Sequence, residues 1–175
     1  MSWTEEFDRI ERQRETLQRE LQGLPEETLS RHPGEGRWSA KQVIEHLMLA
    51  EAGSLKYLTY KLSQGEKLPP PDWRASLRSL LLHFSLWQPL KEFAAPAPVS
   101  QPRNDRPMHE VFADWATLRQ QLRSFLEAAP EAWHQTPSYK HPRAGRLTLV
   151  GMLTFFEAHV ARHTQQIRRT LRAVK

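Results

Sequence analysis

Hydrophobic positions recur at helical spacing through most of this 175-residue chain. In the first segment the apolar stripe consists of Phe7, Ile10, Leu17, Leu21 and Leu24. Such spacings place the side chains on one face of an α-helix. The opening run Ser-Trp-Thr-Glu fits a capping box at Ser2, so the first helix is predicted to begin there and to stop or bend at Pro25.

The same pattern predicts four more helices. They cover residues 39–62, 73–87 and 108–129, and a final stretch that begins after Thr148. A second capping box, Ser-Ala-Lys-Gln, starts at Ser39. No segment alternates with period two for long enough to make a convincing strand, and there is no internal repeat, so the predicted fold class is all-α. Proline-rich connections at 64–72 and 94–107 favour a bundle with long crossovers.

Composition narrows the class of protein. Hydrophobic residues make up 39% of the chain and charged residues 26%, which at this length favours a single globular domain over residues 1–175. Cysteine is absent, which excludes disulfides, thiolate ligands and a cysteine nucleophile. No apolar run reaches the length of a membrane span, and the N-terminus is polar and acidic, so we expect a cytoplasmic protein without a membrane partner.

The chain carries a formal net charge of +5, which raises the question of nucleic-acid binding. The basic residues are scattered along the sequence. Their one dense group, at the end of the predicted last helix, comprises Arg162, Arg168, Arg169, Arg172 and Lys175. Cations there also complement the helix dipole. Arginines and aromatic residues do not alternate, and no helix-turn-helix spacing is evident, so we expect no nucleic-acid partner.

Three histidines are candidates for a metal site. His159 and His163 lie one helical turn apart in the predicted last helix, and this spacing lets two imidazoles reach one cation. His46 occupies the inward stripe of the helix predicted at 39–62. For each histidine taken alone, a hydrogen-bonded core residue is the competing interpretation.

Other polar residues are weaker candidates. Gln42 and Gln166 are placed to hydrogen-bond the imidazoles, or are solvated amides, and Glu51 is a nearby acid whose offset turns it away from His46. His83 and His141 could approach the same cavity, but packing and a loop position explain them as simply. The sequence singles out no catalytic acid or base and no organic cofactor.

Three segments carry a family resemblance. They are residues 36–47, which include the helix cap and His46, residues 140–149, and residues 157–167 with both later histidines. Together they resemble the DinB-like superfamily of DinB/YfiT-like metalloenzymes. The resemblance implies an up-up-down-down four-helix bundle with an additional helix and long crossover loops, usually a homodimer. It also implies a divalent metal ion held by His46, His159 and His163.

Three neutral imidazoles would leave a divalent ion with its full charge and open positions, the pattern of a catalytic site. Zinc or nickel is the expected metal, with iron or manganese as alternatives. Such a site activates water or a thiol, so the predicted function is hydrolysis or S-transfer on a small molecule. In one interpretation the small-molecule substrate is itself a thiol. The alternative is a non-catalytic binding or dimerisation module whose histidines are core residues.

Overall fold

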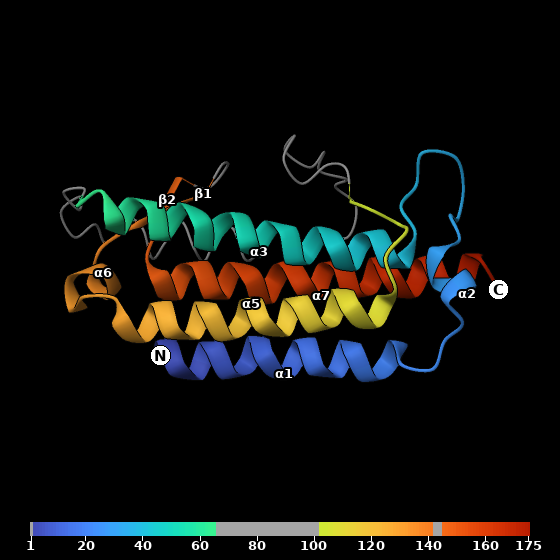
Figure 1. Ribbon diagram of the computed structural model, residues 1–175, viewed down its shortest axis with the longest axis horizontal. Coiled ribbons are helices and arrows are strands. Elements are labelled where there is room, and N and C mark those ends of the chain that lie inside the picture. Colours follow the sequence, from blue (N-terminus) through green and yellow to red (C-terminus); the bar gives the residue numbers. More distant parts are fainter. Residues whose placement is uncertain (1, 66–101, 142–144) are drawn as a thin grey trace.

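The computed structural model describes residues 2–65, 102–141 and 145–175. Four long helices form a bundle (Figure 1). They are α1 (Trp3–Leu21), α3 (Ala40–Ser63), α5 (Met108–Ala128) and α7 (Leu149–Ala173). Two one-turn helices, α2 (Glu26–Ser30) and α6 (Glu131–Gln135), follow α1 and α5 respectively. The all-α class and the four-helix bundle are therefore confirmed for the described part of the chain.

The long helices begin where their capping signals predict. Ser2 and Ser39 each accept a hydrogen bond from the backbone N–H three residues later, and both capping boxes are complete. Thr148 caps α7 by accepting a bond of 3.0 Å from the Gly151 N–H. The first helix ends at Leu21, earlier than the apolar stripe indicates, because the chain turns at Gly23, whose φ is +87°.

The order of the helices around the bundle differs from their order along the chain. Helix α7 packs against α1 and α3, and α5 packs against α3 and α1. Helices α1 and α7 run in one direction, whereas α3 and α5 run in the other (Figure 1). Around the bundle the directions are therefore up, up, down, down, while along the chain they are up, down, down, up. This arrangement makes α3 and α7 antiparallel neighbours.

The interior of the bundle consists of two apolar clusters. One, at the end near α6, includes Ile10, Leu122 and Phe156; the other includes Ile44 and Trp115. All five side chains are almost completely buried. Each large apolar side chain contributes roughly 1.5 to 3 kcal/mol when it leaves water. The clusters fix α3 and α7 against each other, and those two helices carry the histidines described below.

A short β-hairpin precedes α7, and the sequence pattern does not predict it. Strand β1 (Tyr139–His141) pairs antiparallel with β2 (Gly145–Leu147), with Tyr139 opposite Leu147. Three-residue strands are too short to display a period-two pattern, which explains why they escape detection. Both Tyr139 and Leu147 are buried against the bundle, so the hairpin is fixed to the helices.

Some predictions fall outside the described residues. The additional helix expected at 73–87, which contains His83, is one of them, as are most of the two long proline-rich connections. Among the helices that the structure describes, none has the length and apolar character needed to cross a bilayer.

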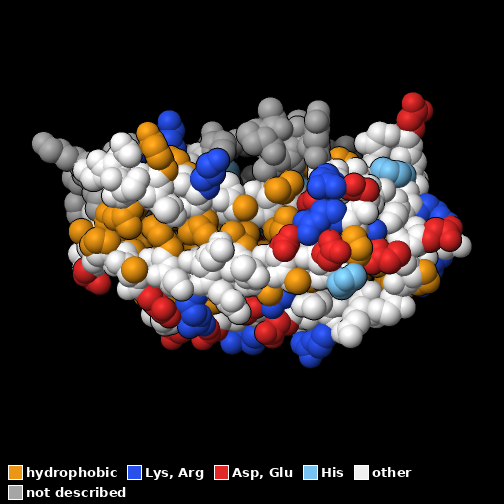
Figure 2. All heavy atoms as spheres, in the orientation of Figure 1, with side chains coloured by type: hydrophobic (Ala, Val, Ile, Leu, Met, Phe, Trp, Pro, Cys, Tyr) orange, Lys and Arg blue, Asp and Glu red, His pale blue; other side chains and the backbone are white. Residues whose placement is uncertain are grey.

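Charged side chains of both signs share the face shown in Figure 2. Several basic residues form ion pairs with acidic partners. Arg123 lies 2.6 Å from Asp8, and Arg168 lies 2.7 Å from Glu20. In Figure 2 the blue and red side chains lie among one another, so on that face the positive charge does not form one basic stripe.

Candidate metal centre

His46, His159 and His163 converge on one point between two helices. His46 lies near the start of α3, and the other two lie one turn apart in the middle of α7. One ring nitrogen of each residue lies within 4.8 Å of a ring nitrogen of the other two. Among the described residues these three make up the group with metal-binding geometry. The structure thus brings together all three histidines that the sequence singles out.

The separation of the nitrogens fits a shared cation. His46 Nε2 lies 3.4 Å from His159 Nε2. Two nitrogens bound to zinc at about 2.0 to 2.1 Å with a tetrahedral angle lie about 3.3 Å apart. The ring centroids are 4.6 to 5.2 Å apart and the rings are steeply inclined to one another, by 66° to 85°. One nitrogen of each ring lies close to a nitrogen of each of the other two.

Gln166 sets the orientation of one imidazole. Its Oε1 lies 2.8 Å from Nδ1 of His163. An amide oxygen only accepts hydrogen bonds, so Nδ1 carries the proton and Nε2 keeps its lone pair. Ligand histidines in metal sites are commonly held by such a bond through the other ring nitrogen. The contact expected between Gln166 and His163 is therefore present.

Burial keeps His159 and His163 neutral. It lowers the pKa of His159 well below its ordinary value, and the neighbouring His163 and His46 lower it further. Burial, with a smaller effect of His46, lowers the pKa of His163 to about 3. A buried imidazole resists protonation because the charged form loses its hydration. Neutral imidazoles are ligands that suit divalent transition-metal ions.

Two aromatic side chains enclose the histidines. Trp38 lies against His46 with ring centroids 5.0 Å apart, and Phe155 stacks on His159 at 5.2 Å with an interplanar angle of 18°. Both aromatic residues are half-buried. Phe155 is not among the residues predicted at the site, although it lies four residues before His159 and so shares a helix face with it. These rings remove water from two sides of the imidazoles.

Gln42, the other proposed partner of an imidazole, caps its own helix instead. Its Oε1 accepts a bond of 3.1 Å from the Ser39 N–H, and its Nε2 donates to the Pro102 carbonyl at 3.1 Å. Both ends of the amide are thus engaged away from His46. The assignment of Gln42 to the histidine site is wrong.

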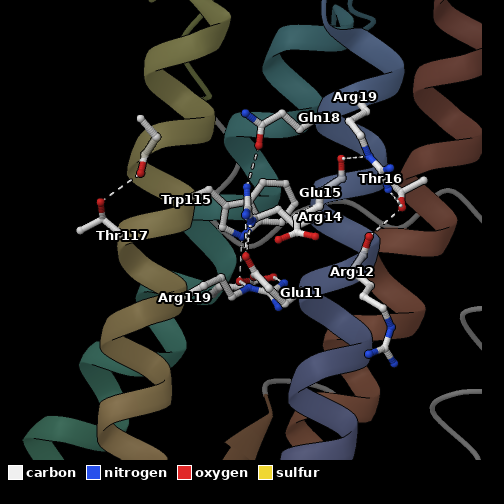
Figure 3. A network of polar contacts seen from close by, with 12 residues as sticks. Glu11, Arg12, Arg14, Glu15, Thr16, Gln18, Arg19, Trp115, Thr117 and Arg119 are labelled. Carbon is white, nitrogen blue, oxygen red and sulfur yellow. Dashed lines mark hydrogen bonds and ion pairs between the residues drawn. The ribbon is translucent and has the colours of Figure 1, made fainter.

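Glu51 is part of a buried ion pair. Its carboxylate accepts two bonds of 2.6 Å from the Arg119 guanidinium and one of 2.8 Å from Trp115 Nε1. Figure 3 shows Arg119 and Trp115 projecting from α5 into the bundle. Glu51 and Arg119 are 2% and 1% exposed, so the pair is sealed from solvent. Glu51 therefore joins α3 to α5 and does not serve as an acid or base at the histidines. No local signal in the sequence identifies Arg119 as its partner.

The remaining described histidines lie elsewhere or beside the site. His134 is 3.0 Å from the Leu126 carbonyl, and His32 is 2.8 Å from the Arg37 carbonyl. His109 is exposed at the start of α5. His141 is a different case because it packs against Phe155.

Comparison with known proteins assigns the family. A sequence model of the DinB superfamily matches residues 9–167. The chain belongs to the DinB superfamily. A comparison with curated protein sequences gives no match.

Among solved structures, this DinB-superfamily chain is similar to YfiT from Bacillus subtilis, which is described as a probable metal-dependent hydrolase with an unusual four-helix bundle topology. The match has a TM-score of 0.62 and covers 98% of this chain and 89% of YfiT. Sequence identity is 17%, so this likeness shows the shared fold. The three-histidine group indicates a divalent metal.

Proposed function

We propose that this DinB-superfamily protein is a metal-dependent enzyme in which His46, His159 and His163 bind one divalent cation. The observation that carries the proposal is the convergence of three ring nitrogens within 4.8 Å of one another. Neutral nitrogen ligands without thiolates favour zinc or nickel, with iron or manganese as alternatives. The match to YfiT supports the same class of function, since that protein is described as a probable metal-dependent hydrolase.

The proposed reaction is hydrolysis or S-transfer on a small molecule. Three protein ligands leave coordination positions open for a reactant, as in catalytic zinc sites. When bound, the cation supplies a Lewis acid that lowers the pKa of water or of a thiol near neutrality. The three imidazoles add no negative charge, so they preserve this electrophilic character.

The residues around the histidines orient them and exclude water. Gln166 holds the His163 ring so that its lone pair faces the other two imidazoles. Trp38 and Phe155 cover the outer sides of His46 and His159. Because the histidines lie on two helices fixed by the apolar core, their separation needs little rearrangement on metal binding.

Metal analysis tests the assignment of the ligands. Wild-type protein is expected to take up one zinc or nickel ion per chain, and His159→Ala is expected to lose stoichiometric uptake. His109→Ala is the matched control, because this exposed histidine lies outside the group. Stoichiometric uptake by His159→Ala, measured by elemental analysis after gel filtration, would show that the site is wrongly assigned.

A turnover assay tests the enzymatic part of the proposal. A panel of thiol conjugates and small amides is incubated with metal-loaded and metal-free protein. Turnover that requires both the metal and His159 supports the enzyme.

The second candidate is a binding or dimerisation module, which is favoured by the engagement of Glu51 in an ion pair away from the histidines. Metal uptake without turnover of any compound in the panel would favour that module.

We also propose a small-molecule substrate, a homodimeric assembly and a cytoplasmic location, with neither nucleic acid nor membrane as a partner. Sedimentation equilibrium of the full chain tests the dimer. A monomer at concentrations well above those in the assay would remove that part of the proposal and leave the metal site unaffected.

A further inference from the structure

Asn104 links the segment before α5 to the connection between α2 and α3. Its Oδ1 accepts a hydrogen bond of 2.6 Å from the Ser39 hydroxyl, and its Nδ2 donates one of 2.8 Å to the Ser30 carbonyl. The side chain thus holds the last residue of α2 and the N-cap of α3 at the same time. Because a carbonyl oxygen only accepts hydrogen bonds, the bond to Ser30 fixes which end of the Asn104 amide is the nitrogen.

The same amide holds His32, and through it the backbone just before Trp38. Nδ2 of Asn104 lies 3.4 Å from Nε2 of His32. Since the Asn104 nitrogen is a donor, Nε2 of His32 accepts, and in the neutral ring the proton is on Nδ1. Nδ1 lies 2.8 Å from the Arg37 carbonyl and donates to it. The peptide bond between Arg37 and Trp38 is therefore held through His32.

Trp38 lies between the two points that Asn104 holds. On one side is the carbonyl bonded to His32, and on the other is Ser39, which is completely buried and caps α3. This stretch of backbone places the indole ring of Trp38 against His46, with ring centroids 5.0 Å apart and planes inclined by 45°. His46 itself is 5% exposed. Trp38 therefore covers part of a histidine of the metal centre.

The connection between α2 and α3 needs such support because its own residues favour many conformations. It contains Gly34 and Gly36, and Gly36 has a φ of +67°. Glycine loses more conformational freedom on ordering than any other residue. Hydrogen bonds from a neighbouring segment offset that loss and favour one conformation. The bonds of Asn104 therefore favour the conformation in which Trp38 meets His46.

We propose that Asn104 and His32 are positioning residues, which hold Trp38 on His46 and thereby slow the exchange of the bound cation. This inference rests on the proposed function, because the cation is the one held by the three histidines of the metal centre. The apolar groups around a metal site control the access of water to it. When the indole ring leaves His46, water reaches that ligand more easily, so the cation is released faster.

Nuclear magnetic resonance of the metal-free protein tests the positioning step. With isotope-labelled histidine, the ring signals of His46 are assigned by their loss in His46→Gln. The ring current of Trp38 shifts these signals in the wild type, and Trp38→Leu is expected to remove the shift. Asn104→Ala and His32→Ala are expected to move the signals toward their positions in Trp38→Leu. Asp105→Ala is the matched control and is expected to leave them unchanged, because this exposed neighbour of Asn104 pairs with an arginine instead.

Release of zinc into an excess of chelator tests the effect on the metal. Trp38→Leu and Asn104→Ala are each expected to release zinc about tenfold faster than the wild type, the lower end of the range for residues around a metal ligand. The double variant is expected to release zinc no faster than Trp38→Leu alone, because Asn104 acts through Trp38. His32→Ala is expected to behave as Asn104→Ala does. Since His32 is exposed, this variant also tests the inference if Asn104→Ala fails to fold.

The outcomes separate the inference from the proposed function. If the wild type retains no zinc, the proposed function fails and the inference falls with it. If zinc is retained but Asn104→Ala and His32→Ala release it at the wild-type rate, only the inference is overturned. Effects of Asn104→Ala and Trp38→Leu that multiply in the double variant would also overturn it, because Asn104 would then act by another route. Unchanged His46 signals in Asn104→Ala would do the same.

Discussion

Acidifying the metal-free protein is expected to destabilise it well above the pH at which folded His163 takes up a proton. Burial and the neighbouring His46 hold the pKa of His163 at about 3 in the folded protein. In the unfolded chain the same group has its ordinary pKa of about 6.5. Between these values the unfolded chain binds a proton that the folded protein does not. Stability is therefore fully present above about pH 6.5 and declines as the pH falls toward 3.

The size of the effect follows from the two pKa values. Well below pH 6.5, one such histidine lowers the free energy of unfolding by about 1.4 kcal/mol per pH unit. Integrated from about pH 7.5 to about pH 5, His163 accounts for a loss of about 2 kcal/mol. The lowered pKa of His159 adds to this loss in the same direction. The chosen range stays above the ordinary pKa of carboxyl groups, so most acidic residues contribute little to it.

Urea unfolding of chelator-treated protein, followed by tryptophan fluorescence, measures this loss. His163→Asn removes the titrating group. Between about pH 7.5 and about pH 5, the decrease in the free energy of unfolding should therefore be about 2 kcal/mol smaller for this variant than for the wild type. The comparison of slopes holds even if the variant is less stable at every pH. His109→Asn, at an exposed site, should parallel the wild type. A His163→Asn curve that also parallels the wild type would refute the reasoning.

Three further predictions concern the same centre and its support. Gln166→Leu should weaken metal affinity about 10- to 100-fold in a chelator competition, and unchanged affinity would contradict the orienting role. Glu51→Gln should lower the free energy of unfolding by about 3 to 5 kcal/mol, because Arg119 loses its buried counter-charge. The exposed control Glu27→Gln should change it by less than about 1 kcal/mol, and an equally small change for Glu51→Gln would contradict the role of the pair. Zinc at about 100 times its Kd should stabilise the wild type by about 2.7 kcal/mol, and a thermal shift that persists in His46→Ala would place the metal elsewhere.

The parts of the fold that sequence predicts correctly depend on local interactions. A capping bond joins residues three positions apart, so the starts of α1, α3 and α7 at Ser2, Ser39 and Thr148 can be read from short runs. The pairing of His159 with His163 depends on helical spacing alone. The contact between Gln166 and His163 is local in the same way.

The errors arise where a partner is distant in the sequence. The position of Gln42 in the sequence is compatible with both a capping box and a contact with His46. Its amide caps the helix because it also donates a hydrogen bond to the Pro102 carbonyl, 60 residues away. Glu51 finds Arg119 across 68 residues, and nothing near either residue signals the pair. The failure to predict strands β1 and β2 has a related cause. Packing on the bundle stabilises these strands, which are too short to show a sequence pattern.

The distance along the chain between the histidine-bearing helices has a consequence for folding. His46 and His159 are separated by 113 residues. An ion shared between them would act as a reversible cross-link that closes most of the polypeptide into a loop, much as a disulfide does in proteins that contain cysteine. Metal capture would then occur only after α3 and α7 have come together. The rate of metal uptake by refolding protein would therefore report when α3 and α7 come together.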